Sequence, residues 1–414
     1  MRKTLIFSFA LTLALALVTA SSGAEEWNRF RGPNGSGLST AAGIPTTWTE
    51  KDYRFQIDLP GSGNSSPVIW QDKLFVTAAD AQKLERYLLC YSTGSGGLLW
   101  QKSWPLEKEK KHAKNSYASN TPACDAERVY TIWQAKERSQ LLAFDHLGQE
   151  LWKYDLGRFE SNHGCGTSPI VVGDVVVVNN NQEGESSFLI GVKAATGEQA
   201  WKIPRAQVKA TYSTPCVFRN AQGKDEVIFS SWHEGITSVD PTTGKINWEK
   251  DVFERDQEKR AIGSPIVAGD LVLANCGFAG GKKFLVAMRP NGETAAEEYR
   301  LDRMVNHQPT TIAVGDLLFL WNDQGVVSCV HAKSGQSVWQ KRVGGNYAGS
   351  PICVGKALYA MSQDGELVVL AAAEEYQELG RMKLPSGSSA TPAVGSGLLW
   401  LRVEDKLLAL GGAK

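Results

Sequence analysis

Basic side chains recur at one fixed distance before a proline in four consecutive segments of the chain. The basic residue lies six positions before the proline in each segment, at His163, Lys209, Lys259 and Arg303. Further polar groups stand nearby, namely Arg260, Asn115, Tyr117, Asn162, Tyr212 and His307. Arg and Lys donors beside Tyr and Asn are common anion-binding groups. These residues are therefore the candidate binding site for a carboxylate, a phosphate or an acidic peptide.

A structural interpretation of the same charges remains open. The loops also carry the carboxylates of Glu254, Asp256, Glu258 and Asp302, which could compensate the cations as ordinary solvated charges. The two interpretations differ in what they predict for replacement of the cations by Ala. Only an anion-binding site would lose affinity for its ligand.

Motifs of metal-dependent and nucleophilic enzymes are absent from the sequence. It contains no H-E-x-x-H, no two His residues four positions apart and no G-x-S-x-G. The segment from Asn179 to Glu183 resembles a calcium loop weakly, but Ile190 stands where the closing acidic ligand belongs. The Gly-rich residues 277–281 indicate a hairpin loop. We therefore predict neither catalytic residues nor a metal site.

The elements that must position these candidates form a repeat. A Ser-Pro or Thr-Pro step followed by branched and aromatic residues recurs along the chain, and Gln308-Pro309 fills the one gap. The steps begin at Ser66, Thr121, Ser168, Thr214, Ser264, Gln308, Ser350 and Thr391, with spacings of 41 to 55 residues. Such a spacing is the length of a four-stranded propeller blade with its turns.

Each repeat also contains a hairpin turn followed by a bulky residue, as in the turn at Thr243-Gly244 and the following Trp248. Alignment of the repeats gives eight bulky positions, namely Phe55, Trp100, Trp152, Trp201, Trp248, Tyr299, Trp339 and Met382. We predict that these side chains dock one blade against the next. The four longest connections from such a residue to the next proline are consecutive, at 104–120, 157–167, 206–213 and 254–263, so one side of the channel rim should stand taller.

The two ends of the chain complement each other. The last repeat predicts strands near residues 398–401 and 406–410 but lacks an outer strand, whereas residues 53–59 resemble an outer strand without a repeat of their own. We therefore predict an all-β fold, a single eight-bladed β-propeller of four-stranded blades, closed by the N-terminal strand completing the last blade. The predicted divisions are a signal peptide at 1–24, an N-terminal extension at 25–49 and the propeller at 50–414.

Composition excludes two classes of protein. The 414 residues carry 44 basic and 44 acidic side chains, so no charge excess would attract nucleic acid. A cationic start, an apolar run at 5–18 and small residues up to Ala24 predict a cleaved signal peptide, and no later apolar run is long enough for a transmembrane anchor. No Cys lies near the cleavage site to carry a lipid. We expect a periplasmic or secreted protein.

The chain has seven cysteines, and this odd number leaves at least one thiol unpaired. Five of them, Cys90, Cys124, Cys216, Cys329 and Cys353, lie in or beside apolar β-type runs, where a buried thiol serves as a small hydrophobic group. Spacing leaves open whether any of the seven form disulfides.

The segment from Val239 to Trp248 resembles the tryptophan-docking motif of pyrroloquinoline quinone (PQQ) repeat propellers. The resemblance covers about residues 50–414, and residues 27–35 are similar to the start of secreted bacterial members without an assigned role. The same family includes quinoprotein alcohol dehydrogenases and the BamB-type propeller of the bacterial outer-membrane assembly machine. The resemblance implies the propeller fold, but the motif reports blade docking rather than chemistry.

Two functional classes follow from this resemblance. The first is a non-catalytic, extracytoplasmic binding or assembly scaffold, which would hold an envelope protein or a small anionic ligand on its loop-rich channel face. The second is a PQQ-dependent dehydrogenase with an altered cofactor slot. Dehydrogenases of the family place PQQ and calcium against a disulfide between adjacent cysteines, and no two cysteines are adjacent here. We therefore favour the scaffold, predict no cofactor, and keep PQQ with calcium for the alternative; a lyase or hydrolase in the channel is a third possibility.

Overall fold

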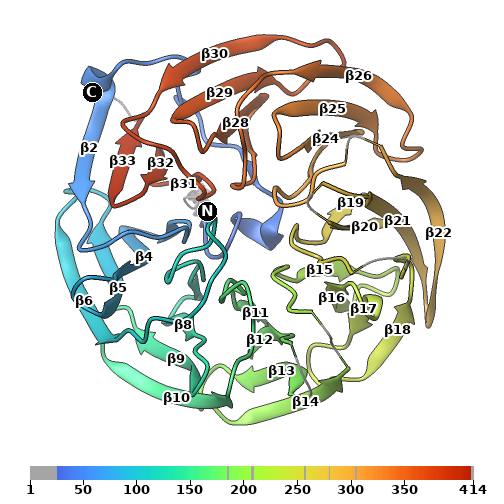
Figure 1. Cartoon of the computed structure of the whole chain (residues 1–414), viewed down its shortest axis with the longest axis horizontal. Coiled ribbons are helices and arrows are strands. Elements are labelled where there is room, and N and C mark those ends of the chain that lie inside the picture. The colour runs from blue at the N-terminus through green and yellow to red at the C-terminus, as the bar shows by residue number, and fades with distance from the viewer. Residues whose placement is uncertain are drawn as a thin grey trace, which may run out of the picture.

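The computed structural model describes residues 26–183, 186–206, 209–255, 258–278, 280–303 and 305–411. Within these residues, eight sheets stand in a ring around a central channel (Figure 1). Each contains four antiparallel strands, and one of them has a fifth strand that is parallel to its neighbour. This architecture confirms the predicted all-β, eight-bladed propeller. The predicted signal peptide at 1–24 lies outside the described residues.

Seven blades are built from four consecutive strands, numbered here from the channel outward. Blades 1 to 4 contain β3 (Val68–Trp70), β4 (Lys73–Asp80), β5 (Glu85–Ser92) and β6 (Leu98–Pro105); β7 (Ala123–Cys124), β8 (Arg128–Trp133), β9 (Ser139–Asp145) and β10 (Glu150–Gly157); β11 (Ile170–Val172), β12 (Val175–Asn180), β13 (Ser187–Lys193) and β14 (Gln199–Arg205); and β15 (Cys216–Arg219), β16 (Asp225–Ser231), β17 (Gly235–Val239) and β18 (Ile246–Lys250). Blades 5 to 7 contain β19 (Ile266–Ala268), β20 (Leu271–Gly277), β21 (Lys283–Asn291) and β22 (Thr294–Leu301); β23 (Ile312–Val314), β24 (Leu317–Trp321), β25 (Val326–His331) and β26 (Ser337–Arg342); and β27 (Ile352–Val354), β28 (Ala357–Met361), β29 (Glu366–Ala371) and β30 (Glu378–Lys383).

The eighth blade joins the two ends of the chain. It contains β31 (Ala393–Gly395), β32 (Leu398–Val403), β33 (Lys406–Leu410) and, as its outer strand, β2 (Tyr53–Asp58). The strand β2 runs antiparallel to β33, with Tyr53 opposite Leu410 and Asp58 opposite Lys406, and Figure 1 shows the blue β2 beside the red β33. The predicted closure by the N-terminal strand is confirmed.

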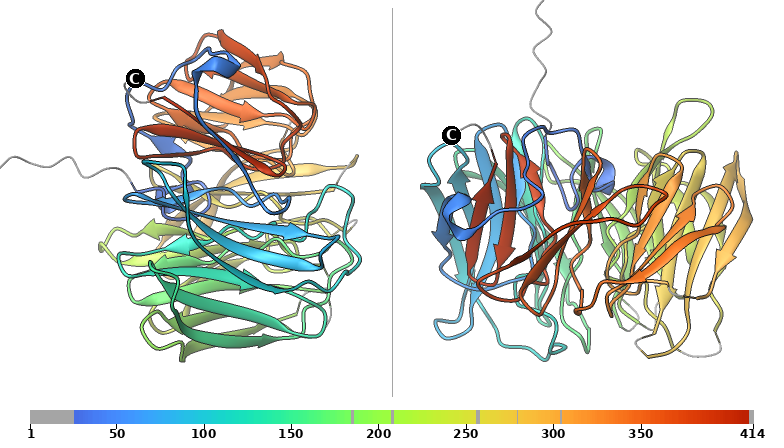
Figure 2. Two further views of the ribbon diagram at one scale, coloured as in Figure 1. Left: turned by 90° about the vertical axis from the view of Figure 1, so that its left-hand side faces the viewer. Right: turned by 90° about the horizontal axis from the view of Figure 1, so that it is seen from above.

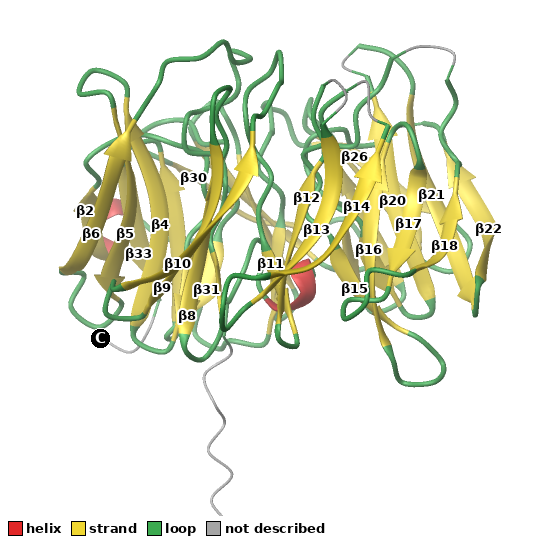
Figure 3. Cartoon of the chain, turned by 90° about the horizontal axis from the view of Figure 1, so that it is seen from below, coloured by secondary structure: helices red, strands yellow, loops and turns green. Residues whose placement is uncertain are grey.

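The strands show the burial expected of stacked blades. All residues of β12 are buried, because both faces of a central blade strand are covered by neighbouring blades. The outer strand β6 is mostly exposed and alternates between exposed and partly buried side chains along most of its length. Side views show the blades around the axis (Figures 2 and 3). The connections between blades share one rim with the hairpins between second and third strands, such as β20–β21, and the other hairpin turns lie on the opposite rim.

The Ser/Thr-Pro steps form a ring of hydrogen bonds around the channel. The backbone N–H of the hydroxyl residue in one blade donates to the hydroxyl oxygen of the corresponding residue in the next blade, at 2.9 to 3.1 Å, and seven such bonds are present among the described residues. The ring residues are Ser66, Thr121, Ser168, Thr214, Ser264, Thr310, Ser350 and Thr391. The bond from Thr391 N–H to Ser66 Oγ joins the last blade to the first.

This ring corrects one assignment made from the sequence. Thr310, not Gln308, accepts the Ser264 N–H and donates its own N–H to Ser350 Oγ. Thr310 also stands two residues before its inner strand β23, as Ser264 stands two residues before β19. The proline at position 309 therefore lies ahead of the true step, in which Thr311 occupies the proline position.

Seven of the eight predicted docking residues occupy one register position, next to the β-bulge of the outer strand. The prediction is wrong in blade 7, where Gly380 holds this position opposite Val369 and Met382 lies two residues further along.

Five of the six docking residues that have a donor bond to a carbonyl oxygen at the next blade's hairpin turn: Trp100 to His146, Trp152 to Ala194, Trp201 to Pro241, Tyr299 to Ala332 and Trp339 to Ala373, at 2.7 to 3.1 Å. The sixth, Trp248, has no hydrogen-bond partner for its Nε1 among the described residues. The turn glycine allows this approach. Gly244 has φ 74°, and a Cβ there would lie 2.7 Å from the Trp201 side chain.

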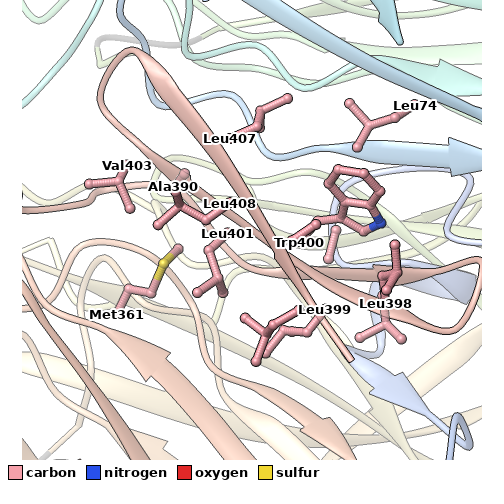
Figure 4. Packing of buried hydrophobic residues seen from close by; sticks show 14 of the residues in the cluster. Leu74, Met361, Ala390, Leu398, Leu399, Trp400, Leu401, Val403, Leu407 and Leu408 are labelled. Atoms are coloured by element: carbon pink, nitrogen blue, oxygen red, sulfur yellow. The ribbon is translucent and has the colours of Figure 1, made fainter. Parts of the chain in front are cut away.

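The most extensive apolar cluster lies where the ring closes. It joins side chains of blades 7, 8 and 1, including Leu74, Met361 and Trp400, all essentially inaccessible to solvent (Figure 4). In the described part of the chain none of the seven cysteines is disulfide-bonded, and six of them are buried. Among the described residues no helix combines the length and apolar character needed to cross a bilayer.

Candidate functional site

A cavity of about 270 Å³ lies on the channel axis, inside the ring of hydroxyl residues. We call the segments that link the outer strand of one blade to the inner strand of the next the connecting loops. All eight connecting loops reach the cavity, through residues that include Asn64, Asn115, His163, Tyr212, Arg260, His307, Ala348 and Ser389. The end of the β20–β21 hairpin adds Gly277 and Phe278, and Phe278 is 47% exposed.

The other end of the channel is crossed by residues 27–39, which we call the N-terminal plug. Backbone N–H groups of Ile69 in blade 1 and Cys124 in blade 2 donate to carbonyl oxygens of the plug, at 2.9 and 2.8 Å. At the other end of the plug, β1 (Leu38–Ser39) pairs in parallel with β27 of blade 7. Phe30 extends from the plug to line the cavity.

Side chains fix the plug to the inner strands. The Asn34 amide exchanges two hydrogen bonds with the backbone of Val217 in blade 4, at 2.7 and 2.8 Å. Arg31 is fully buried and donates to the carbonyl oxygens of Gly35 and Pro351, and burial lowers the pKa of its guanidinium to about 9. The plug thus touches four blades and closes the cavity on one side.

The connecting loops that lead into blades 5 and 6 supply one polar wall of the cavity. The backbone of Arg260 pairs with that of Gly277, which holds this loop against the hairpin end. His307 is only 6% exposed, and neither of its ring nitrogens makes a hydrogen bond of good geometry with another described residue. Asp323 accepts the backbone N–H groups of His307 and Gln308, at 2.9 and 3.1 Å, and so fixes the loop that carries the imidazole. Burial lowers the pKa of His307 despite the nearby Asp323 carboxylate.

The facing wall consists of two loops tied to each other. The rings of His112 and His163 stack with their centroids 5.3 Å apart. The Asn115 amide donates to the carbonyl oxygens of His163 and Cys165, at 2.7 and 2.8 Å. Burial, reinforced by the charge of Arg260, lowers the pKa of His163. Cys165 is partly exposed, but burial raises the pKa of its thiol to about 11.

Glu183 connects three parts of this rim. It accepts hydrogen bonds from Arg260, at 2.6 Å, and from the side chain and backbone of Asn162. Burial alone would raise the pKa of this carboxyl, but the bonds from Arg260 and Asn162 outweigh burial and lower it. One nitrogen of Arg260 is therefore engaged behind the cavity wall, while its Nε has no hydrogen-bond partner among the described residues.

The structure brings together six of the ten candidate ligand-binding residues. The six that line the cavity are Asn115, His163, Tyr212, Lys259, Arg260 and His307. Tyr212 also bonds through its hydroxyl to Ser161 at 2.8 Å, and Lys259 donates to the Glu254 carbonyl oxygen at 2.8 Å.

The other four candidates lie elsewhere. Lys209 forms an ion pair of 2.8 Å with Glu258, as the structural interpretation of the charges expected. Arg303 is exposed, Asn162 bonds to Glu183, and the Tyr117 hydroxyl donates to the Glu109 carbonyl oxygen at 3.0 Å. The regular spacing before proline thus does not place Lys209 and Arg303 on the cavity with Lys259.

Sequence reasoning missed several lining residues. His112 and Lys114 line the cavity from the longest connecting loop, and the hydroxyl residues of the ring line it at almost every blade. The recurring Ser or Thr of the repeat could have identified the hydroxyl residues as lining residues. The plug residue Phe30 had no such signal, because its place depends on contacts with distant blades.

The chemistry of the lining residues does not fit a calcium-assisted quinone. Calcium needs several oxygen ligands, and carboxylates usually supply most of their charge. Among the described residues that line the cavity there is no Asp or Glu, and the ionisable cations or potential cations are Lys114, Lys259, Arg260 and three His residues. In the described part of the chain no three His, Cys, Asp or Glu side chains gather as metal ligands.

Comparison with known proteins identifies relatives by family and by fold. The family model described as outer membrane protein assembly factor BamB matches residues 84–341 and 282–410. No curated protein sequence matches the chain significantly. BamB from Moraxella catarrhalis superposes with a TM-score of 0.63 at 16% identity, over 87% of this chain and 97% of that one.

Two further solved structures share the fold. Quinohemoprotein alcohol dehydrogenase from Comamonas testosteroni gives a TM-score of 0.65 at 13% identity, over 94% of this chain and 81% of that one. Sqt1 from Saccharomyces cerevisiae gives 0.64 at 11% identity, over 88% and 99%. At these identities the likeness concerns the fold alone.

Proposed function

Because this chain belongs to the PQQ-like propeller family whose model is described as outer membrane protein assembly factor BamB, we propose that it is a non-catalytic binding or assembly scaffold. It acts outside the cytoplasm, in the periplasm or after secretion, and holds a ligand or protein segment on the rim of the connecting loops. The predicted signal peptide supports this location.

One observation carries the proposal: the channel is a blind pocket. The plug closes one end, and all eight connecting loops converge on the other. A concave site with apolar surfaces and a few convergent polar groups is the usual form of a ligand site. Phe30, Ile262 and Phe278 supply the apolar surface, and the hydroxyl ring supplies polar groups.

The first experiment titrates the purified mature chain with PQQ, with and without calcium, in a calorimeter. The scaffold is expected to give no saturable heat, because the lining residues offer a calcium ion no carboxylate. Calcium-dependent binding at about one site per chain would instead favour the quinoprotein dehydrogenase.

The second experiment locates the binding face. A photo-crosslinking amino acid at Phe278 on the pocket rim is compared with one at Leu147, which is 81% exposed on a hairpin turn of the opposite rim. We expect adducts from envelope extracts at Phe278 only. The variant Ala348→Trp tests whether binding needs the cavity. Ala348 is a partly exposed residue of the cavity wall, so a tryptophan side chain there would fill the cavity. If the ligand enters the cavity, the adducts at Phe278 should disappear in this variant. Adducts only at Leu147 would contradict the proposal.

A further inference from the structure

We propose that the blind pocket selects an oxyanion, a carboxylate or phosphate group held by Arg260, His307 and the protons of the hydroxyl ring. This inference rests on the proposed function, since it assigns a ligand class to the same pocket. It differs from the arc of cations predicted from the sequence, because Lys209 and Arg303 take no part in it.

The first argument is His307. Its imidazole is almost completely buried on the cavity wall, yet both ring nitrogens lack a hydrogen bond of good geometry. Burial lowers the pKa of His307, and the Asp323 carboxylate and the Gly277 backbone offset only part of that shift. A buried polar group without a partner costs free energy, so a ligand that accepts a hydrogen bond from this ring would relieve the cost.

The second argument is the direction of the hydrogen bonds in the hydroxyl ring. Each ring hydroxyl that accepts a neighbour's backbone N–H keeps its own O–H proton as a donor. Ser264, Thr310 and Ser350 follow one another around the wall that also holds Arg260 and His307, and all of them line the cavity. Within the described residues these three hydroxyl protons meet no acceptor, so a ligand that offers several acceptor oxygens suits this wall best.

The third argument is charge. Burial lowers the pKa of both His163 and His307, and the positive charge of Arg260 lowers both further. All three residues line the cavity. The Arg260 partner Glu183 and the Asp323 carboxylate both hold loops in place, and neither lines the cavity. Lys114 adds a further positive charge. Donors without facing carboxylates favour an anion over a neutral sugar or a cation.

The test is a calorimetric titration of the full mature chain with citrate, with inorganic phosphate and with glucose as a neutral probe. Citrate offers carboxylate groups and inorganic phosphate offers a phosphate group, so the comparison shows which of the two oxyanions the pocket prefers. We expect saturable heat at about one site per chain with at least one anion, and none with glucose.

Variants then identify the groups that hold the anion. Arg260→Met and His307→Leu are each expected to weaken binding about tenfold or more, as for loss of a hydrogen bond to a charged group. Arg303→Gln is the matched control, since it removes an exposed cation just ahead of the His307 loop, and it should change affinity less than about twofold. If His307→Leu fails to fold, Lys114→Met at the exposed rim replaces it and should also weaken binding.

Three outcomes would overturn the inference. The first is that wild type, Arg260→Met and His307→Leu bind the anion with equal affinity. The second is that glucose binds as tightly as the anions. The third is that the chain binds no anion but still crosslinks through position 278. The third would leave the binding function standing. A chain that neither binds an anion nor crosslinks at that position would overturn both proposals.

Discussion

The docking tryptophans differ in one chemical detail, the partner of the indole N–H. Trp201 donates to the Pro241 carbonyl oxygen at 2.7 Å, whereas the buried Nε1 of Trp248 has no hydrogen-bond partner among the described residues. Both indoles are otherwise buried between blades. The pair therefore separates the contribution of the hydrogen bond from that of packing.

We expect Trp201→Phe to lower the free energy of unfolding by about 1 kcal/mol more than Trp248→Phe, because only the first change removes a hydrogen bond. Trp201→Ala should cost on the order of 3 to 5 kcal/mol through the cavity it leaves. Urea unfolding followed by circular dichroism measures all three. An equal cost for the two Phe variants would show that the carbonyl contact contributes nothing.

The histidines of the pocket make stability depend on pH. Burial lowers the folded-state pKa of His163 and His307 below the unfolded value of about 6.5. As the pH falls through that value, the unfolded chain binds protons that the folded chain resists, so stability falls with it. The contribution vanishes above about pH 7.5, where both states are neutral.

We therefore expect the thermal midpoint to decline between about pH 7 and pH 5, and to decline less in the double variant His163→Gln, His307→Gln. An oxyanion in the pocket favours the protonated rings, so citrate should reduce the decline in the wild type. Parallel pH profiles for wild type and double variant would contradict this assignment.

At the scale of the element, the repeat allowed the eight blades and their order to be predicted, because strand-opening steps and docking residues recur in most units; Gly380 stands at the docking position of blade 7. The sixth unit misled the alignment, since Thr311 takes the place of proline and Pro309 stands two residues early. The candidate site was harder to predict. The connecting loops differ in length, so residues at the same distance before the proline do not reach the same place. Lys259 lines the cavity, whereas Lys209 pairs with Glu258.

The ring assignment leads to a test at Thr310. Thr310→Val removes the hydroxyl that accepts the Ser264 N–H and leaves a buried donor unpaired, which should cost about 1 to 3 kcal/mol of unfolding free energy. Thr310→Ser keeps the acceptor and should cost far less. Gln308→Val, at the position first aligned with the ring, serves as the control and should stay within about 0.5 kcal/mol of wild type in the same urea assay. Equal losses at 308 and 310 would contradict the assignment.

At the scale of the whole molecule, stability depends on a ring that is joined without a covalent bond. The strand β2 and the contact between Thr391 and Ser66 connect blades whose residues are more than 300 positions apart in sequence. Ring closure covers the sheet faces that the first and last blades would otherwise expose, and β2 pairs with the outer edge of β33. Weakening this junction should therefore affect the entire propeller.

Gln56→Pro tests this dependence. Gln56 faces Leu408 in the β2–β33 ladder, and proline cannot donate to such a ladder. We expect a lower thermal midpoint and concentration-dependent self-association, measured by light scattering, because β33 then presents an unpaired edge. Gln56→Thr should behave as wild type. A monomeric Gln56→Pro chain of unchanged midpoint would show that closure does not need this strand.

The same junction sets the order in which the protein can mature. The plug and β2 are the first described segments to be synthesised, yet their partners in blades 7 and 8 are among the last. Until those partners emerge, the early segments have no complete binding surface and stay available to chaperones or proteases. A chain that stops before blade 8 therefore cannot close its ring, so biogenesis itself acts as a check on length, and only full-length translation yields a finished pocket.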